Sequence, residues 1–145
     1  MPAYQTSYAV NQAVGYPGMV ADVEFTTNMA YEIQTAAAGF GLAVGRGSAD
    51  RTAKINGAGY VGVTIANKAA LNAAGTGYAV GDIAAVMTKG SIWVTAGAAV
   101  TPADAVLFAA ATGVISNIAA GGTAIPNARF LTTAANGALV QLQLL

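Results

Sequence analysis

The sequence predicts an all-β fold, a jelly-roll-like β-sandwich or barrel of short antiparallel strands with an extended N-terminal arm. Two observations lead to this prediction. From residue 29 onward, apolar residues alternate with small or polar residues in several short stretches, which is the period of a half-buried strand. In addition, 18 glycines divide the 145 residues into short segments. Many short strands separated by turn residues are typical of sandwiches, jelly rolls and barrels.

The first 28 residues differ from the rest, because they contain only short apolar runs between polar residues. We therefore divide the chain into an N-terminal arm and junction, residues 1–28, and a β domain, residues 29–145. A length of 145 residues suits a single domain overall.

Four stretches show the alternation most clearly. In the first, Met29, Tyr31 and Ile33 share one face, and the last, with Val140 and Leu142 between glutamines, is the cleanest. We expect a strand in each of these ranges, with the larger apolar residues facing inward. The four ranges are 29–35, 40–45, 60–65 and 140–144.

Two further segments share the same order of residue types. Each has an aspartate, an apolar stretch, a glycine and then a second apolar stretch. We interpret both as hairpins. Asp82 and Asp104 would bond the backbone at the entering turn, and Gly90 and Gly113 would reverse the chain. The two segments cover residues 81–94 and 103–116.

One local pattern supports a helix instead of a strand at residues 101–112. Thr101 would be the N-cap, Pro102 the first helical residue, and Gly113 stands just past the end. The parallel with residues 81–94 favours strand, and both readings stay open. Residues 67–74 fit a short helical turn or a loop equally well.

Charge and composition exclude several classes of function. Six Lys/Arg and six Asp/Glu give no net charge, so the chain cannot form the basic stripe that nucleic acids require. Its longest apolar stretch is interrupted by Pro102 and Asp104, so we expect no membrane span, and the N-terminus shows no export signal. Sparse charge promotes association, which predicts a surface covered by other protein or, alternatively, a neutral monomer.

Catalytic groups are scarce. The chain has no histidine and no cysteine, which excludes the common nucleophile pairs, general bases and zinc sites. Asp22 and Glu24 could in principle hold a cation, but a solvated strand edge or an ion-pair partner explains them better. The glycines of residues 39–47 alternate within a strand pattern, which favours close backbone approach over phosphate binding. We expect no enzyme activity, no cofactor and no metal.

Two sets of residues are candidates for contacts with other proteins. Tyr4, Tyr8 and Tyr16 are spaced through the polar leader, before the turn residue Pro17. Tyrosine offers a large rigid surface with a hydrogen-bonding tip, which suits interfaces. The arm could cross to a neighbouring molecule or form an edge strand on its own domain.

The second set is Arg46, Arg51 and Lys54, the basic cluster of the sequence. Its segment is rich in glycine and serine, so we expect a loop. The cluster is either a solvated loop tip or a contact with an acidic patch on a larger partner.

Eight short motifs follow one another along the chain, at residues 17–22, 39–47, 62–63, 78–82, 90–94, 104–106, 128–132 and 137–142. Their order resembles that of the structural cement, or decoration, proteins of tailed-phage capsids. Each motif is a turn followed by an apolar strand, so the ordered set carries the resemblance. One departure is Pro102 before Asp104, where the family more often has glycine.

This resemblance implies a non-enzymatic virion protein on the outer capsid surface. It would bind an assembled shell, bridge neighbouring major capsid proteins and stabilise the shell. The partners would be the major capsid protein and other copies of the chain, with a trimer favoured slightly over a dimer. Two rival classes stay open, namely a secreted or surface β-sandwich adhesin and a small enzyme that uses carboxylates alone.

Overall fold

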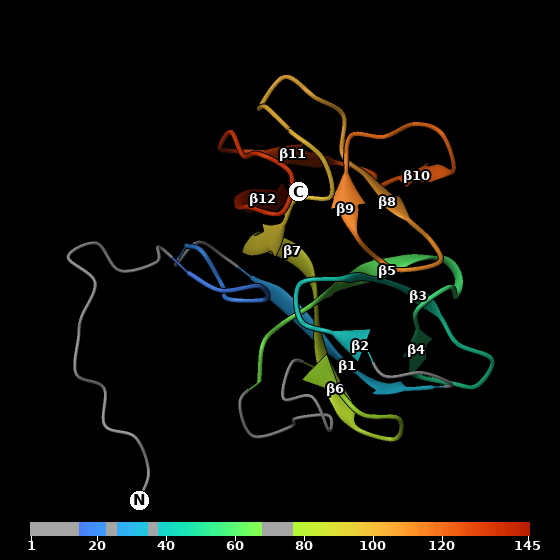
Figure 1. Ribbon diagram of the computed structural model, residues 1–145. Coiled ribbons are helices and arrows are strands. Elements are labelled where there is room, and N and C mark those ends of the chain that lie inside the picture. The colour runs from blue at the N-terminus through green and yellow to red at the C-terminus, as the bar shows by residue number, and fades with distance from the viewer. Residues whose placement is uncertain (1–14, 23–25, 35–37, 68–76) are drawn as a thin grey trace, which may run out of the picture.

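The computed structural model describes residues 15–22, 26–34, 38–67 and 77–145 of the chain. These residues form strands, turns and irregular segments without a helix, which confirms the predicted all-β fold (Figure 1). The strands are β1 (Thr27–Ile33), β2 (Ala38–Gly39), β3 (Ala43–Arg46), β4 (Thr52–Lys54), β5 (Ala58–Thr64), β6 (Gly77–Tyr78), β7 (Ile83–Thr95), β8 (Leu107–Ala109), β9 (Ile115–Ser116), β10 (Gly122–Ala124), β11 (Ala128–Phe130) and β12 (Leu139–Leu144).

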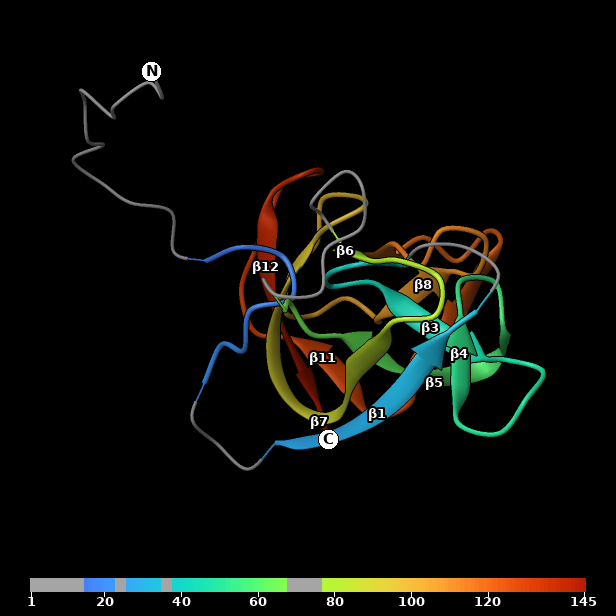
Figure 2. The ribbon, with the colours of Figure 1, turned by 90° about the horizontal axis from the view of Figure 1, so that it is seen from below.

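The main sheet contains a closed barrel. Its strand order is β1-β4-β3-β5-β7-β12-β11, and β1 also pairs with β7, so the first five strands close on themselves. Figure 2 shows β1 running along the curved β7. Beyond the barrel, β7 continues beside β12 and β11, and a small sheet of β10, β8 and β9 lies next to them in Figure 1.

The long strand β7 corrects one prediction. Gly90 does not reverse the chain, because residues 83–95 form one continuous strand. The first part of this strand pairs with β1 and β5, and the second part pairs with β12, so both parts have partners without a turn. Gly90 has φ of +129°, and an added Cβ there would lie 2.8 Å from Cγ2 of Thr26. Its missing side chain makes room for a neighbouring segment.

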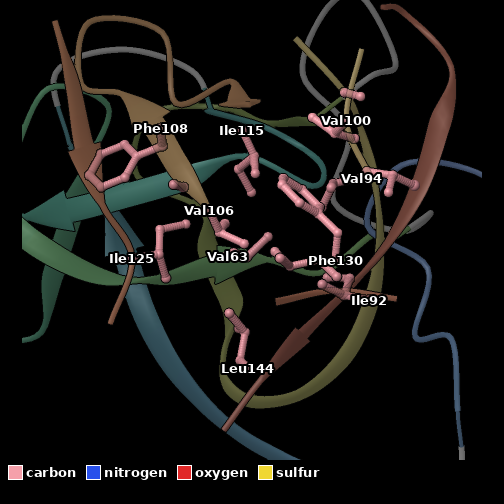
Figure 3. Packing of buried hydrophobic residues seen from close by; sticks show 14 of the residues in the cluster. Val63, Ile92, Val94, Val100, Val106, Phe108, Ile115, Ile125, Phe130 and Leu144 are labelled. Atoms are coloured by element: carbon pink, nitrogen blue, oxygen red, sulfur yellow. The ribbon is translucent and has the colours of Figure 1, made fainter. Parts of the chain in front are cut away.

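The side chains of β7 enter two separate hydrophobic cores. Ala84 and Val86 belong to the barrel core, together with Ile33, Val44 and Tyr78. The second core lies where β7 meets β12 and the small sheet, and Figure 3 shows its side chains converging. Its larger members include Met87, Ile92, Val94, Phe108, Ile115, Phe130, Leu142 and Leu144.

The C-terminal strand β12 forms as predicted. Val140, Leu142 and Leu144 are buried in the second core, whereas Gln141 and Gln143 alternate with them on the other face. The prediction for residues 60–65 holds in part, since β5 covers most of that range and buries Val63. Val61 and Ile65, which were also expected to face inward, are half-buried, whereas Thr64 is fully buried.

The other two strand predictions are only partly right. In β1, Ile33 is buried but Met29 is 40% exposed, because this end of the strand projects past the barrel core. Residues 40–45 are not one strand, since the chain turns at Phe40 and Gly41 before β3 begins. Gly41 has φ of +69°, which favours glycine and ends the alternating pattern there.

Two aspartates build equivalent turns, as predicted. The Ala79 amide donates to Oδ2 of Asp82 at 2.9 Å, and the Thr101 amide donates to Oδ2 of Asp104 at 2.7 Å. The bond from Thr101 holds the pKa of Asp104 below its usual range. No helix follows this turn.

The chain after the second turn enters β8 instead and returns through β9. Gly113 lies in the connection between these strands with φ of +76°, so the predicted hairpin is confirmed there. The range 67–74 lies almost entirely outside the described residues.

The hydroxyl groups of two core tyrosines, Tyr78 and Tyr60, differ in their hydrogen bonding. The hydroxyl of Tyr78 donates to the carbonyl oxygen of Ile65 at 2.5 Å, and its ring meets Phe40 edge to face. The hydroxyl of Tyr60, which packs beside Phe108, is buried with no hydrogen-bond partner among the described residues. Burial raises the pKa of both phenols.

Replacing each tyrosine by phenylalanine should therefore have opposite effects. We expect Tyr60→Phe to raise the free energy of unfolding by about 1 kcal/mol, because it removes an unsatisfied buried hydroxyl. Tyr78→Phe should lower it by about 1 kcal/mol, because a made hydrogen bond is lost. Denaturant unfolding measures both, and each variant controls for the other. Equal destabilisation by the two substitutions would contradict this account.

Candidate interaction surfaces

The Gly/Pro stretch near the N-terminus forms a tight turn. The Met19 amide donates to the carbonyl oxygen of Tyr16 at 3.1 Å, which closes a four-residue turn. Pro17 occupies its second position and Gly18, with φ of +82°, its third. This arrangement matches a type II turn, which needs a positive φ at the third residue. The sequence Tyr-Pro-Gly-Met is therefore suited to its local structure.

Gly18 lies buried against three other segments. Its amide donates to the carbonyl oxygen of Trp93 at 2.8 Å, and its own carbonyl accepts from the Ala66 amide at 2.8 Å. A Cβ at position 18 would lie 2.7 Å from that amide nitrogen and 2.8 Å from Cβ of Phe40. Gly41 is equally close on the other side, since a Cβ there would lie 2.8 Å from the Gly18 nitrogen. The predicted close approach of backbones in residues 39–47 is found here.

The residues after the turn continue along β7. The Trp93 amide donates to the carbonyl of Met19, and the Ala21 amide donates to that of Ser91, each at 2.8 Å. Nε2 of Gln141 donates to Oδ2 of Asp22 at 2.8 Å, which ties this segment to β12. The junction is therefore fixed to the second part of β7.

The tyrosine set is only partly described. Tyr16 is 42% exposed, and Pro17 beside it is half-buried. Tyr4 and Tyr8 lie outside the described residues, as does Glu24, the predicted neighbour of Asp22. The division between arm and domain at residues 28 and 29 stays a prediction.

The basic cluster lies on a hairpin. Arg46 ends β3, Arg51 lies in the turn with φ of 54°, and Lys54 ends β4. We expected a loop for this segment, but β3 and β4 pair through Gly45 with Lys54 and Arg46 with Ala53. The sequence lacks a long alternating pattern here because the two strands are only four and three residues long.

Thr52 and Gln34 hold this hairpin turn in shape. The Thr52 hydroxyl donates to the Ala49 carbonyl at 2.6 Å, and the Gly47 amide donates to the Thr52 carbonyl at 2.9 Å. Oε1 of Gln34, just past β1, accepts from the Ser48 amide at 3.0 Å. A hydrogen bond thus links the turn to Gln34, the residue that follows β1.

A surface cleft of about 320 Å³ separates the hairpin turn from β1. Arg46 and Arg51 both line it, whereas Lys54 does not. Met29 and Tyr31 of β1 form the opposite wall, and the remaining lining comes from residues 47–50 and 52. The structure therefore brings two of the three predicted basic residues together, beside strand β1.

Sequence reasoning missed an exposed apolar pair. Val80 is 56% exposed and Ile83 is 61% exposed, at the turn that leads into β7. The pattern placed Ile83 within a hairpin strand, and it does begin β7. The pattern does not show that this end of β7 extends beyond the core.

Neither a metal-ligand cluster nor a membrane-spanning helix is found among the described residues. Within these residues no group of three or more His, Cys, Asp or Glu side chains could hold a metal ion. The same part of the chain has no helix with the length and apolar character needed to cross a membrane.

Comparison with known proteins identifies the family. A family model described as "Structural cement protein (E217 gp24/Pam3 gp6)" matches residues 4–145. The chain therefore belongs to the phage structural cement proteins, which confirms the resemblance seen in the motifs. Membership in this family gives it a structural role in the virion.

Similar chains also occur among solved structures. A chain from "The capsid of Myoviridae Phage XM1" is similar, with a TM-score of 0.76 and 16% identity over 97% of this chain and 96% of that one. This similarity shows a shared fold. The head fiber gp8.5 N base of bacteriophage phi29 is more distant, with a TM-score of 0.44 and 14% identity over 83% of this chain and 95% of that one. No curated protein sequence matches the chain.

The packing of Gly18 yields a test of the junction. Gly18→Ala should lower the free energy of unfolding by about 2–4 kcal/mol, because it adds overpacking to a positive φ. Gly121 is a matched control, with φ of +72° and nothing within 4 Å of an added Cβ. Gly121→Ala should cost only about 1 kcal/mol. Denaturant unfolding compares the two variants, and equal losses would show that Gly18 is not closely packed.

Proposed function

We propose that this protein binds the outer surface of an assembled phage capsid, bridges neighbouring major capsid proteins and stabilises the shell without catalysing a reaction. The observation that carries the proposal is the family match over residues 4–145. The low charge of the chain and its exposed apolar side chains, including Tyr16, Val80 and Ile83, are consistent with a surface that contacts other proteins.

Stabilisation would follow from linkage. A protein that binds the assembled lattice, but not separated subunits, shifts the equilibrium toward the lattice, by about 2.7 kcal/mol per site at a hundredfold excess over Kd. Bridging two subunits adds a second contact at high effective concentration, which strengthens attachment further.

We also propose that the chain acts as a homo-oligomer, with a trimer favoured slightly over a dimer. Symmetric copies would present several identical contacts to a symmetric lattice. The candidate contact residues are those predicted from the sequence, Tyr4, Tyr8, Tyr16, Pro17, Arg46, Arg51 and Lys54.

The proposal is tested by adding the purified chain to shells assembled from the major capsid protein alone. We expect co-sedimentation with the shells and a higher temperature of shell disruption, because binding stabilises the lattice. Unassembled capsid subunits serve as the control and should bind weakly. Shells that neither retain the protein nor change their disruption temperature would refute the proposal.

A truncation tests the predicted arm. Removing residues 1–14 leaves the turn at Tyr16 to Met19 intact, so the domain should unfold at nearly the same denaturant concentration. Loss of arm contacts should weaken shell binding by about a hundredfold, the lower end of the gain from one linked contact. Sedimentation with shells measures the binding. A truncated chain that cannot fold would show that these residues belong to the domain itself.

A further inference from the structure

Strand β1 has one backbone edge that is largely unpaired. Along one edge, residues 27–32 pair with β7. Along the other edge, β4 pairs only with Glu32 and Ile33. In the described part of the chain, no strand covers residues 27–31 on this second edge.

The hydrogen bonds show which groups face the uncovered edge. The Ile33 amide donates to the Asp82 carbonyl on the β7 side, whereas the Glu32 amide donates to the Arg51 carbonyl on the β4 side. Because backbone groups alternate along a strand, Ala30 and Asn28 face the same side as Glu32. Their amides and carbonyls point toward the hairpin of β3 and β4.

The cleft described above lies along this edge. Its opposite wall is the turn of the basic hairpin, and Arg51 reaches across it, with Nη2 donating to the Ala30 carbonyl at 3.3 Å. Met29 and Tyr31 supply apolar surface beside the uncovered backbone. Met29 and Tyr31 flank Ala30, so the cleft borders the uncovered edge of β1 on one side and carries two arginines on the other.

The charges around this cleft favour an acidic occupant. Two cationic side chains, Arg46 and Arg51, line the cleft, against one carboxylate, that of Asp50. Arg46 and Arg51 are exposed, and neither forms an ion pair within the described residues. Guanidinium groups pair with carboxylates through strong, directional hydrogen bonds.

We propose that an extended acidic segment of the major capsid protein binds in this cleft by adding a strand to the free edge of β1. Strand addition to an exposed sheet edge is a common mode of peptide recognition. Residues 27–31 offer about 17 Å of strand, room for about five residues of the partner. The proposal rests on the proposed function, since it assigns the partner of that same capsid-binding protein.

Arg51 changes its contact when the segment binds. In the free chain its guanidinium occupies the Ala30 carbonyl. In the complex that carbonyl accepts an amide of the segment, and the guanidinium is free to pair with an acidic side chain. The arginine thus shields the edge before binding and contributes specificity after it.

The first test removes one edge donor. Ala30→Pro deletes an amide that faces the uncovered edge of β1 while leaving the amides toward β7 in place. Ala124→Pro is its control, because the Ile125 amide bonds the Val106 carbonyl and Ala124 on the edge strand β10 therefore faces away from β8. With shells of the major capsid protein as the probe, Ala30→Pro should weaken binding at least tenfold and Ala124→Pro less than twofold. Equal effects would overturn the proposal.

The second test changes charge without touching the backbone. Arg46→Glu and Arg51→Glu should each weaken shell binding about tenfold, and the loss should shrink at high salt. Arg129→Glu makes the same charge change on β11, at the other end of the main sheet, and should leave binding unchanged. Because these side chains are exposed, the variants should fold even if Ala30→Pro does not. Unchanged binding by both cleft variants would overturn the proposal.

The third test identifies the occupant. The chain has no cysteine, so Ala49→Cys in the cleft can carry a single photocrosslinker. On shells, the crosslinked peptide should be an acidic segment of the major capsid protein. A peptide from a second copy of this chain would overturn the proposal.

Capsid binding and the β1 site can fail separately. If the wild-type chain binds and stabilises shells but the cleft variants bind equally well, the proposed function stands and the β1 site falls. If the wild-type chain does not bind shells, both fall together.

Discussion

The backbone pairing of β7 is the constraint on which the rest of the structure depends. This one strand is hydrogen-bonded to β1 and β5 in the barrel, and to β12 and the junction beyond it. Its side chains then enter both hydrophobic cores, with Val86 in one and Ile92 in the other. A buried strand must pair its amides and carbonyls on both edges, so the position of β7 determines where the other segments lie.

Glycines make the close contacts around this strand feasible. A Cβ at Gly18 or Gly41 would lie within 3 Å of another backbone atom, so the turn at Pro17 can only dock where side chains are missing. The same holds between β3 and residue 57, where a Cβ at Gly45 would lie 2.5 Å from the Gly57 carbonyl carbon. The glycine-rich composition therefore reflects backbone packing as well as turns.

Local patterns predicted the features that depend on neighbouring residues. The alternation in β12, the turns at Asp82 and Asp104 and the hairpin at Gly113 all follow from a few adjacent side chains. The role of Gly90 could not be predicted this way, because a glycine can end a strand or lie within one. Only the pairing of β7 with distant strands decides between these outcomes.

The candidate site was predictable only in part, for a similar reason. The basic residues were visible in the sequence, but the cleft needs β1 and the hairpin side by side. That arrangement comes from the parallel pairing of Glu32 with Thr52 and from the bond between Gln34 and Ser48. Sequence patterns carry little information about such long-range contacts. The family, in contrast, was recognisable from motif order alone.

The continuity of β7 has a consequence for how the protein loses its structure. Two hydrophobic cores in one chain could open independently, and each opening would expose backbone amides to exchange with solvent. Because the same strand supplies buried side chains to both cores, neither can open fully without disturbing the other. The central amides of β7 should therefore exchange only through global unfolding, and the chain should behave as one cooperative unit.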